Sequence, residues 1–134
     1  MPSDAVRWKI TPAAAVRKGY LCIGHTMSVD KVAAFTEILA QDPDHAFARY
    51  GLGIEYAQRG DTALALQQFD ELERRHPDYT AGYQMAAQIL MASGNTPKAE
   101  ERLRAGVASA RRAGNQHALA EMEGMLEELA EHNT

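Results

Sequence analysis

Apolar residues recur at helical spacing in six consecutive segments after residue 28. Residues 29–41, for example, carry Val32, Phe35, Ile38 and Leu39. Steps of three and four residues bring such side chains onto one face of a helix. The pattern therefore predicts an all-α domain over residues 28–134, whose first helix covers residues 29–41. The later helices are predicted at residues 45–59, 62–76, 79–93, 96–113 and 116–131.

Short stop signals separate these segments. Asp42-Pro43 ends the first one, because proline disfavours helix for the residue before it. Three glycines, each followed by Asp or Asn, mark further breaks, at Gly60-Asp61, Gly94-Asn95 and Gly114-Asn115. Glycine supplies a left-handed C′ position, and the following side chain can accept from free backbone N–H groups of the next helix. Asp44 and Asp78, each directly after a proline, are predicted to act as further N-caps.

Residues 1–27 differ from the rest in holding scattered Pro and Gly and the apolar run Tyr20–Ile23, the one segment with weak strand character. Thr11-Pro12 could start a helix, with proline at its first position. Two interpretations follow. Residues 12–24 are a degenerate first helix of a repeat, or residues 1–27 are a loosely ordered N-terminal extension. We favour the extension.

One spacing recurs along the chain. Residues of the same type stand 34 positions apart in four pairs, Phe35 and Phe69, Pro43 and Pro77, Gly60 and Gly94, and Ala65 and Ala99. A fixed period of this length indicates a copied structural unit that buries its apolar face by stacking on its neighbours. Such stacks are usually scaffolds for binding.

The repeated unit resembles the tetratricopeptide repeat, in the short bacterial form of that family. The strongest match spans residues 46–79 and rests on Leu52, Gly53, Tyr56, Gly60, Asp61, Ala65, Phe69, Leu72 and Pro77. A looser unit spans residues 80–113, with Gly106 and Arg111 departing from the family pattern. Residues 29–45 look like a second helix alone, and 115–131 like a capping helix. The resemblance implies a short right-handed α-solenoid.

In this family the first helix of each unit lines a concave groove that captures a peptide or partner helix. The resemblance places these residues of this chain at groove positions: Phe47, Tyr50, Ile54, Gln58, Ala81, Gln84, Met85, Gln88, Met91, Ala118, Met122 and Met125. A known family subset binds C-terminal carboxylates through Lys, Arg and Asn at such positions. Aromatic, aliphatic and amide side chains stand there instead, which argues against a carboxylate clamp. The expected partner is a protein or peptide.

Composition narrows the function classes. The formal net charge is −4, with 18 acidic and 14 basic residues, whereas a nucleic-acid-binding domain normally carries a basic surplus. Cys22 is the single cysteine, so an intramolecular disulfide is impossible and a reducing compartment is expected. No apolar run has the roughly 20 residues needed to span a bilayer. We expect a cytoplasmic protein that binds neither nucleic acid nor membrane.

Catalytic or metal chemistry finds little support in the sequence. The five histidines show no metal-ligand spacing, and Cys22 has no base nearby in the sequence. We expect no enzyme activity, metal or cofactor. Arg102, Arg104, Arg111 and Arg112 make residues 96–113 basic near their end, either as a solvated face that complements the helix dipole or as a docking patch for an acidic partner.

The sequence thus predicts a protein-interaction scaffold with a peptide-binding groove. Self-assembly is the alternative. If helix 29–41 lacks a preceding helix of its own, its stripe of Val32, Phe35 and Leu39 would be uncovered and would favour a homodimer.

Overall fold

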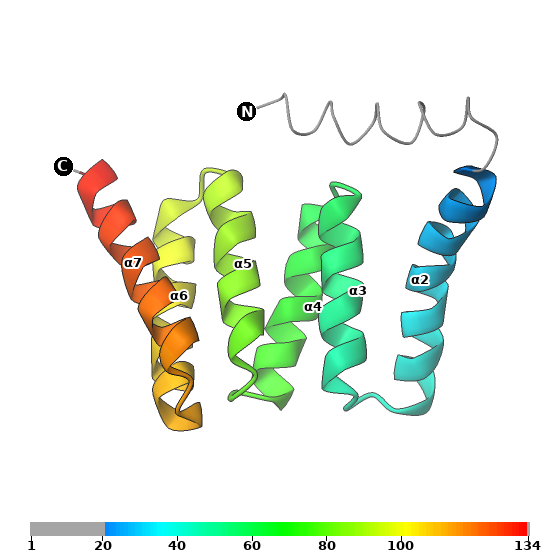
Figure 1. The fold of residues 1–134 in the computed structure, drawn as a ribbon, viewed down its shortest axis with the longest axis horizontal. Coiled ribbons are helices and arrows are strands. Elements are labelled where there is room, and N and C mark those ends of the chain that lie inside the picture. Colours follow the sequence, from blue (N-terminus) through cyan, green and yellow to red (C-terminus); the bar gives the residue numbers. More distant parts are fainter. Residues whose placement is uncertain (1–20, 134) are drawn as a thin grey trace. The chain divides into compact units, whose positions relative to one another are not determined.

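The computed structural model describes the backbone of residues 21–133 and the side chains of residues 31–133. The described residues form helices joined by short turns, with no strand among them (Figure 1). The helices are α2 (Leu21–Gln41), α3 (Ala46–Gln58), α4 (Thr62–Arg75), α5 (Thr80–Ala92), α6 (Thr96–Ala113) and α7 (Gln116–His132). The all-α prediction is confirmed, and most helix ends lie within one residue of their predicted positions.

The exception is the first helix. Helix α2 begins at Leu21, eight residues before the predicted start at Val29. Leu21–Ile23 is therefore helical, and the strand character assigned to that run is wrong for these residues. The predicted helix start at Thr11-Pro12 lies in residues 1–20, outside the described residues. The chain divides into two compact units between Ala34 and Phe35, inside α2.

The predicted glycine stops are confirmed. Gly60, Gly94 and Gly114 adopt φ values of 85°, 80° and 70°. In this left-handed region glycine has no Cβ penalty. Asn95 and Asn115 cap α6 and α7, since their side-chain oxygens accept from the backbone N–H of Lys98 and Ala118.

The three aspartates do not cap helices as predicted. Asp61 precedes α4 but makes no side-chain capping bond. His45 takes the capping role expected of Asp44, because its Nδ1 atom accepts from Ala48 N at 3.1 Å. Tyr79 is the residue before α5. Asp44 and Asp78 instead form ion pairs with Arg75 and Arg112, which come from later in the chain.

Antiparallel helix pairs stack through two apolar clusters. In Figure 1, α3 and α5 lie in front of α4 and α6. The first cluster centres on Phe69 and Leu72 of α4 with Ala86 of α5. The second joins α5, α6 and α7 around Leu90, Leu103 and Met122. Because each cluster takes side chains from consecutive pairs, neither pair completes its core alone.

Small residues set how closely the helices approach. A Cβ atom on Gly53 would lie 2.7 Å from the Phe69 ring, and one on Gly106 would lie 2.5 Å from Met122 Sδ and 2.8 Å from Tyr83 Cβ. Gly106 departs from the family pattern, and its lack of a side chain lets Tyr83 of α5 and Met122 of α7 pack directly on α6. Tyr83 further anchors α5 by donating from its hydroxyl to Pro77 O at 3.0 Å.

Candidate functional site

Helix α3 presents a graded apolar row. Phe47 is 64% exposed, Tyr50 and Ile54 are half-buried, and Gln58 at the helix end is exposed. Steps of three and four residues keep these side chains on one side of the helix. The first residue of the row is therefore mostly exposed to solvent, while the next two pack on the core.

Tyr50 is fixed by two aromatic neighbours. Its ring lies edge-on to Phe69 with centroids 6.0 Å apart, and tilted against Tyr79 at 5.5 Å. Edge and tilted arrangements suit the ring quadrupoles. Burial raises the pKa of Tyr50. The side chain thus belongs partly to the core, and its exposed edge is held in one orientation.

Helix α5 contributes amides and methionines beside this row. Gln88 is exposed, whereas Gln84, Met85 and Met91 are half-buried. Gln84 donates from Nε2 to Glu121 Oε1 of α7 at 2.8 Å. Met85 packs on the same cluster that Tyr50 and Ile54 cover. The described parts of α3 and α5 therefore share one apolar base.

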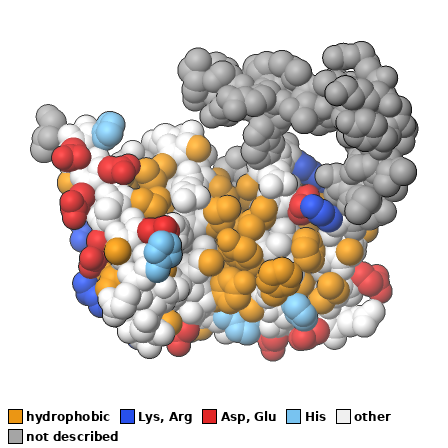
Figure 2. Space-filling view, in the orientation of Figure 1, with side chains coloured by type: hydrophobic (Ala, Val, Ile, Leu, Met, Phe, Trp, Pro, Cys, Tyr) orange, Lys and Arg blue, Asp and Glu red, His pale blue; other side chains and the backbone are white. Residues whose placement is uncertain are grey.

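Figure 2 shows hydrophobic side chains gathered over α3 and towards α5, with polar groups and a histidine over α7. We call this surface the α3–α5 face. We define it by the predicted groove positions on α3 and α5, which are Phe47, Tyr50, Ile54, Gln58, Gln84, Gln88 and Met91; Ala81 of α5 is also exposed.

Two predicted groove positions on α7 do not reach the surface. Met122 is completely buried, with its sulfur against Gly106, and Ala118 is 8% exposed. Met125 is half-buried and packs on the second cluster. Met122 is therefore a core residue and cannot touch a ligand on this face. Glycine at position 106 leaves the space that the Met122 side chain fills.

The basic end of α6 is occupied within the chain. Arg111 pairs with Glu123 of α7, Arg112 with Asp78 before α5, and Arg104 with Glu100 on its own helix. Arg112 also donates to Pro77 O at 3.1 Å. The contacts of Arg111 and Arg112 run between consecutive units, which argues against the alternative that this end is a docking patch for an acidic partner.

Arg102 makes the most buried of these contacts. It bonds both carboxylate oxygens of Glu73 at 2.7 Å and also contacts Asp70, all on α4. Burial raises the pKa of Glu73, and Arg102 opposes that rise. For Arg102 burial acts to lower the pKa, but the bonds to the two carboxylates outweigh it, so the pKa rises.

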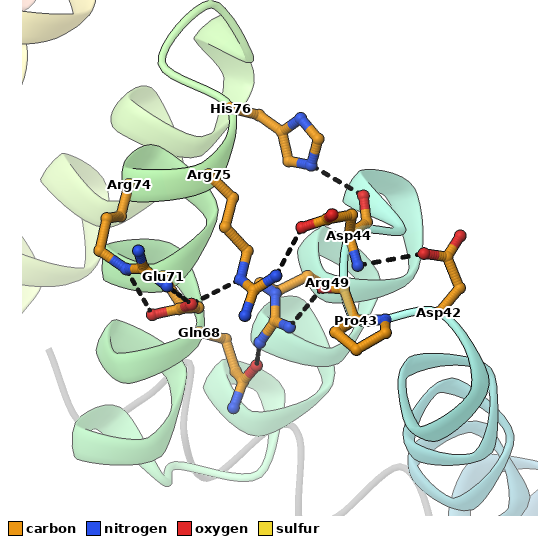
Figure 3. Close-up of polar contacts among 9 residues, drawn as sticks. All are labelled: Asp42, Pro43, Asp44, Arg49, Gln68, Glu71, Arg74, Arg75 and His76. Carbon is orange, nitrogen blue, oxygen red and sulfur yellow. Dashed lines mark hydrogen bonds and ion pairs between the residues drawn. The ribbon is translucent and has the colours of Figure 1, made fainter.

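A second polar network secures the turn before α3 (Figure 3). Arg75 bridges Asp44 and Glu71, and His76 Nε2 lies 2.8 Å from Asp44 O. Hydrogen bonds from Arg74 and Arg75 lower the pKa of Glu71 to about 2. A shallow cleft lined by Arg75, His76, Pro77, Asp78 and Tyr79 opens beside it. Since Arg75, His76 and Asp78 already have partners, this network is structural.

Arg49 is the only basic side chain of α3, and it is committed to the scaffold. It donates to Gln68 Oε1 at 3.1 Å and to Pro43 O at 2.8 Å. Burial is the main cause that lowers its pKa. The α3–α5 face therefore offers apolar area and amide groups, without a cation directed at a ligand.

Among the described residues, no group of three or more His, Cys, Asp and Glu side chains could hold a metal ion. Within that part, too, no helix combines the length and apolar character that crossing a membrane requires.

Sequence reasoning missed Tyr79 and Glu121. Tyr79 looked like a helix start after Pro77-Asp78, yet its ring stacks on Tyr50 across the chain. Glu121 is one of five glutamates on α7, and Gln84 holds its carboxylate at the edge of the face. Both contacts join residues far apart in the sequence, so no local sequence pattern could predict them.

Comparison with known proteins agrees with this architecture. The family model described as "Tetratricopeptide repeat" matches residues 56–122, which is half of the chain. A TPR repeat-containing protein of Pseudomonas aeruginosa is 29% identical over 98 residues, covering 73% of this chain and 93% of that protein.

Solved structures show the same fold. A tetratricopeptide repeat domain protein from Salinibacter ruber has a TM-score of 0.62 and 28% identity, covering 66% of this chain and 89% of that one. The Yersinia enterocolitica type III secretion chaperone SycD, in complex with a peptide of the translocator YopD, has a TM-score of 0.73 and 16% identity. It covers 100% of this chain and 98% of that one. With its period of 34 residues, its paired helices and the matched family model, the chain belongs to the tetratricopeptide repeat family.

Proposed function

We propose that this protein is an interaction scaffold whose α3–α5 face binds a peptide or a helical segment of another protein. The single observation that carries the proposal is Phe47, an aromatic side chain left 64% exposed at the start of α3. Aromatic residues supply large contact area and are enriched where proteins bind one another. With Tyr50 and Ile54 following on the same side, an apolar segment could cover all three.

The neighbouring amides suit a peptide backbone. Gln88 is exposed on α5, and its side chain offers both a donor and an acceptor. Met91, half-buried near the end of α5, adds a flexible thioether that adapts to different side chains. The face thus combines apolar anchoring with backbone hydrogen bonding.

The likeness to SycD supports the fold alone at 16% identity, but a peptide complex on that fold is consistent with the proposal. A binding role also agrees with our expectation of a cytoplasmic, non-enzymatic protein without affinity for nucleic acid.

Self-assembly through α2 has weaker support. The Phe35 ring packs against α3 at Gly51, where an added Cβ atom would lie only 2.5 Å from the ring. Phe35 and Leu39 are half-buried rather than exposed. The centre of the stripe is thus covered within the chain, so we place peptide binding before a homodimer.

The test is selection from a display library of random 12-residue peptides on the full chain, followed by fluorescence anisotropy with the enriched peptides. Phe47→Asp removes apolar area at an exposed position, and we expect affinity to fall by about tenfold or more. Gln88→Ala should weaken the same peptides less. Tyr50 is a poorer choice for substitution, since its contacts with Phe69 and Tyr79 also support the fold.

Leu64→Asp is the matched control, because Leu64 is 41% exposed but lies on α4. It should leave affinity unchanged, and both variants should melt like the parent protein. Enriched peptides that bind Phe47→Asp as tightly as the parent would sink the proposal.

A further inference from the structure

Charge is divided between the two sets of helices. Helices α3, α5 and α7 together contain one arginine and six glutamates, and α5 has no charged residue at all. Helices α4 and α6 contain seven lysines and arginines against five acidic residues. Five of the six glutamates lie on α7, and Glu55 of α3 is only 7% exposed, so the accessible acidic charge of this set of helices is on α7.

The one arginine on that side does not offset this charge for a ligand. Arg49 already donates to Gln68 and to Pro43 O. A carboxylate on a bound segment would thus find no uncommitted cation among the described residues of α3, α5 and α7. A segment with acidic side chains would lose hydration there without gaining an ion pair.

A basic side chain has a defined partner instead. Glu121 on α7 stands beside the face, because Gln84 of α5 donates to its Oε1 atom at 2.8 Å. Its Oε2 atom lies 2.9 Å from Nε2 of His117, and its side chain is 45% exposed. A carboxylate can accept about four hydrogen bonds, so this group keeps room for a lysine or arginine.

We propose that the segment bound by the α3–α5 face is basic as well as apolar, with an apolar side chain on Phe47, Tyr50 and Ile54 and a lysine or arginine at Glu121. This inference rests on the proposed function and adds the partner's chemistry. Complementary charge chiefly speeds association and rejects acidic segments. The same charge would orient the segment along the direction from α3 towards α7.

The experiment uses the library selection described above and reads out two further quantities. Peptides whose binding depends on Phe47 should contain more lysine and arginine than the input library, and they should bind more weakly as NaCl rises from 50 to 500 mM. Glu121→Gln should weaken them by about two- to fivefold, the range of an exposed ion pair. Replacing the peptide's basic residue with glutamine should abolish that difference.

Glu101→Gln is the matched control, because Glu101 is exposed on α6 in the other set of helices; it should leave binding unchanged. Peptides that depend on Phe47 but lack basic enrichment and ignore Glu121→Gln would overturn this inference and leave the proposed function standing. If no selected peptide depends on Phe47, both the inference and the proposed function fail.

Discussion

The two helix pairs at residues 46–79 and 80–113 follow the same period but fill it differently. The first packs around an aromatic group, Phe69 with Tyr50 and Tyr79. The second packs through small residues, among them Ala86, Ala99 and Gly106, which let helices and the Met122 side chain come close. Only the first leaves a large aromatic residue in solvent. The 34-residue period therefore determines the backbone arrangement. The residues chosen at each position determine which unit exposes apolar surface to solvent.

The largest expected effect compares the two cores. Phe69→Ala should cost about 4 kcal/mol, because Phe69 is completely buried and also contacts Tyr50. Leu103→Ala in the second pair should cost about 3 kcal/mol, because its smaller side chain leaves a smaller cavity. Urea unfolding followed by far-UV circular dichroism measures both. A cost below about 1.5 kcal/mol for Phe69→Ala would show that the aromatic core is not what supports the first pair.

The next effect tests the close packing of the second pair. Gly106→Ala should destabilise by about 1–3 kcal/mol, because the new Cβ meets Met122 Sδ and Tyr83 Cβ. Gly124→Ala is the matched control on α7, where a Cβ would meet nothing within 4 Å. That change should stabilise by about 0.5–1 kcal/mol through helix propensity. Equal effects of the two substitutions in thermal melts would contradict the packing argument.

A smaller effect separates the helix caps. Asn115→Ala should cost about 1 kcal/mol, since its side chain accepts from Ala118 N at 3.0 Å. Asp61→Ala should cost about 0.5 kcal/mol or less, because Asp61 makes no side-chain capping bond and loses only charge–dipole attraction. Chemical denaturation of the two variants side by side decides the order, and the reverse order would refute it.

The smallest effect concerns pH, where two carboxylates of α4 should act in opposite directions. Side-chain hydrogen bonds from Arg74 and Arg75 lower the pKa of Glu71 from 4.5 to about 2. The contribution of Glu71 to stability is therefore present above pH 4.5 and is lost as the pH falls towards 2. Glu71→Gln should therefore flatten the acid limb of the stability curve. Melting temperatures between pH 7 and 2.5 provide the measurement.

Glu73 is the control for that curve. Burial raises its pKa, so its contribution is present at low pH and is lost as the pH rises through its folded-state pKa. Glu73→Gln should consequently steepen the acid limb. If both variants shifted the limb in the same direction, the assignment of these two environments would be wrong.

Much of the fold could be predicted because its signals are local. Helix α6 begins and ends at the predicted residues, Thr96 and Ala113, since Asn95, Pro97 and Gly114 specify its ends within a few positions. The start of α2 was predicted too late, because Gly24 disfavours a helix interior and Ser28 is of the N-cap type, so the local pattern favours a start at Val29. Along α3 the periodicity also placed Phe47, Tyr50 and Ile54 on one side.

The candidate site was less predictable, because contacts between distant residues decide it. The family resemblance predicted Met122 as a groove residue. Its side chain is instead buried in the core, in the space left by Gly106, 16 positions earlier. In the same way Asp44 and Asp78 are residues of the N-cap type, yet they pair with Arg75 and Arg112, which lie 31 and 34 positions later in the sequence.

The sequence by itself determined the helices, their order and the period that stacks them, because caps, glycine stops and apolar spacing act over a few residues. The tertiary structure decided which groove positions remain open, which arginines are already paired, and that Gln84 holds Glu121 beside the apolar row. These outcomes depend on the space left between helices and on side chains brought together from separate units, which no local pattern encodes.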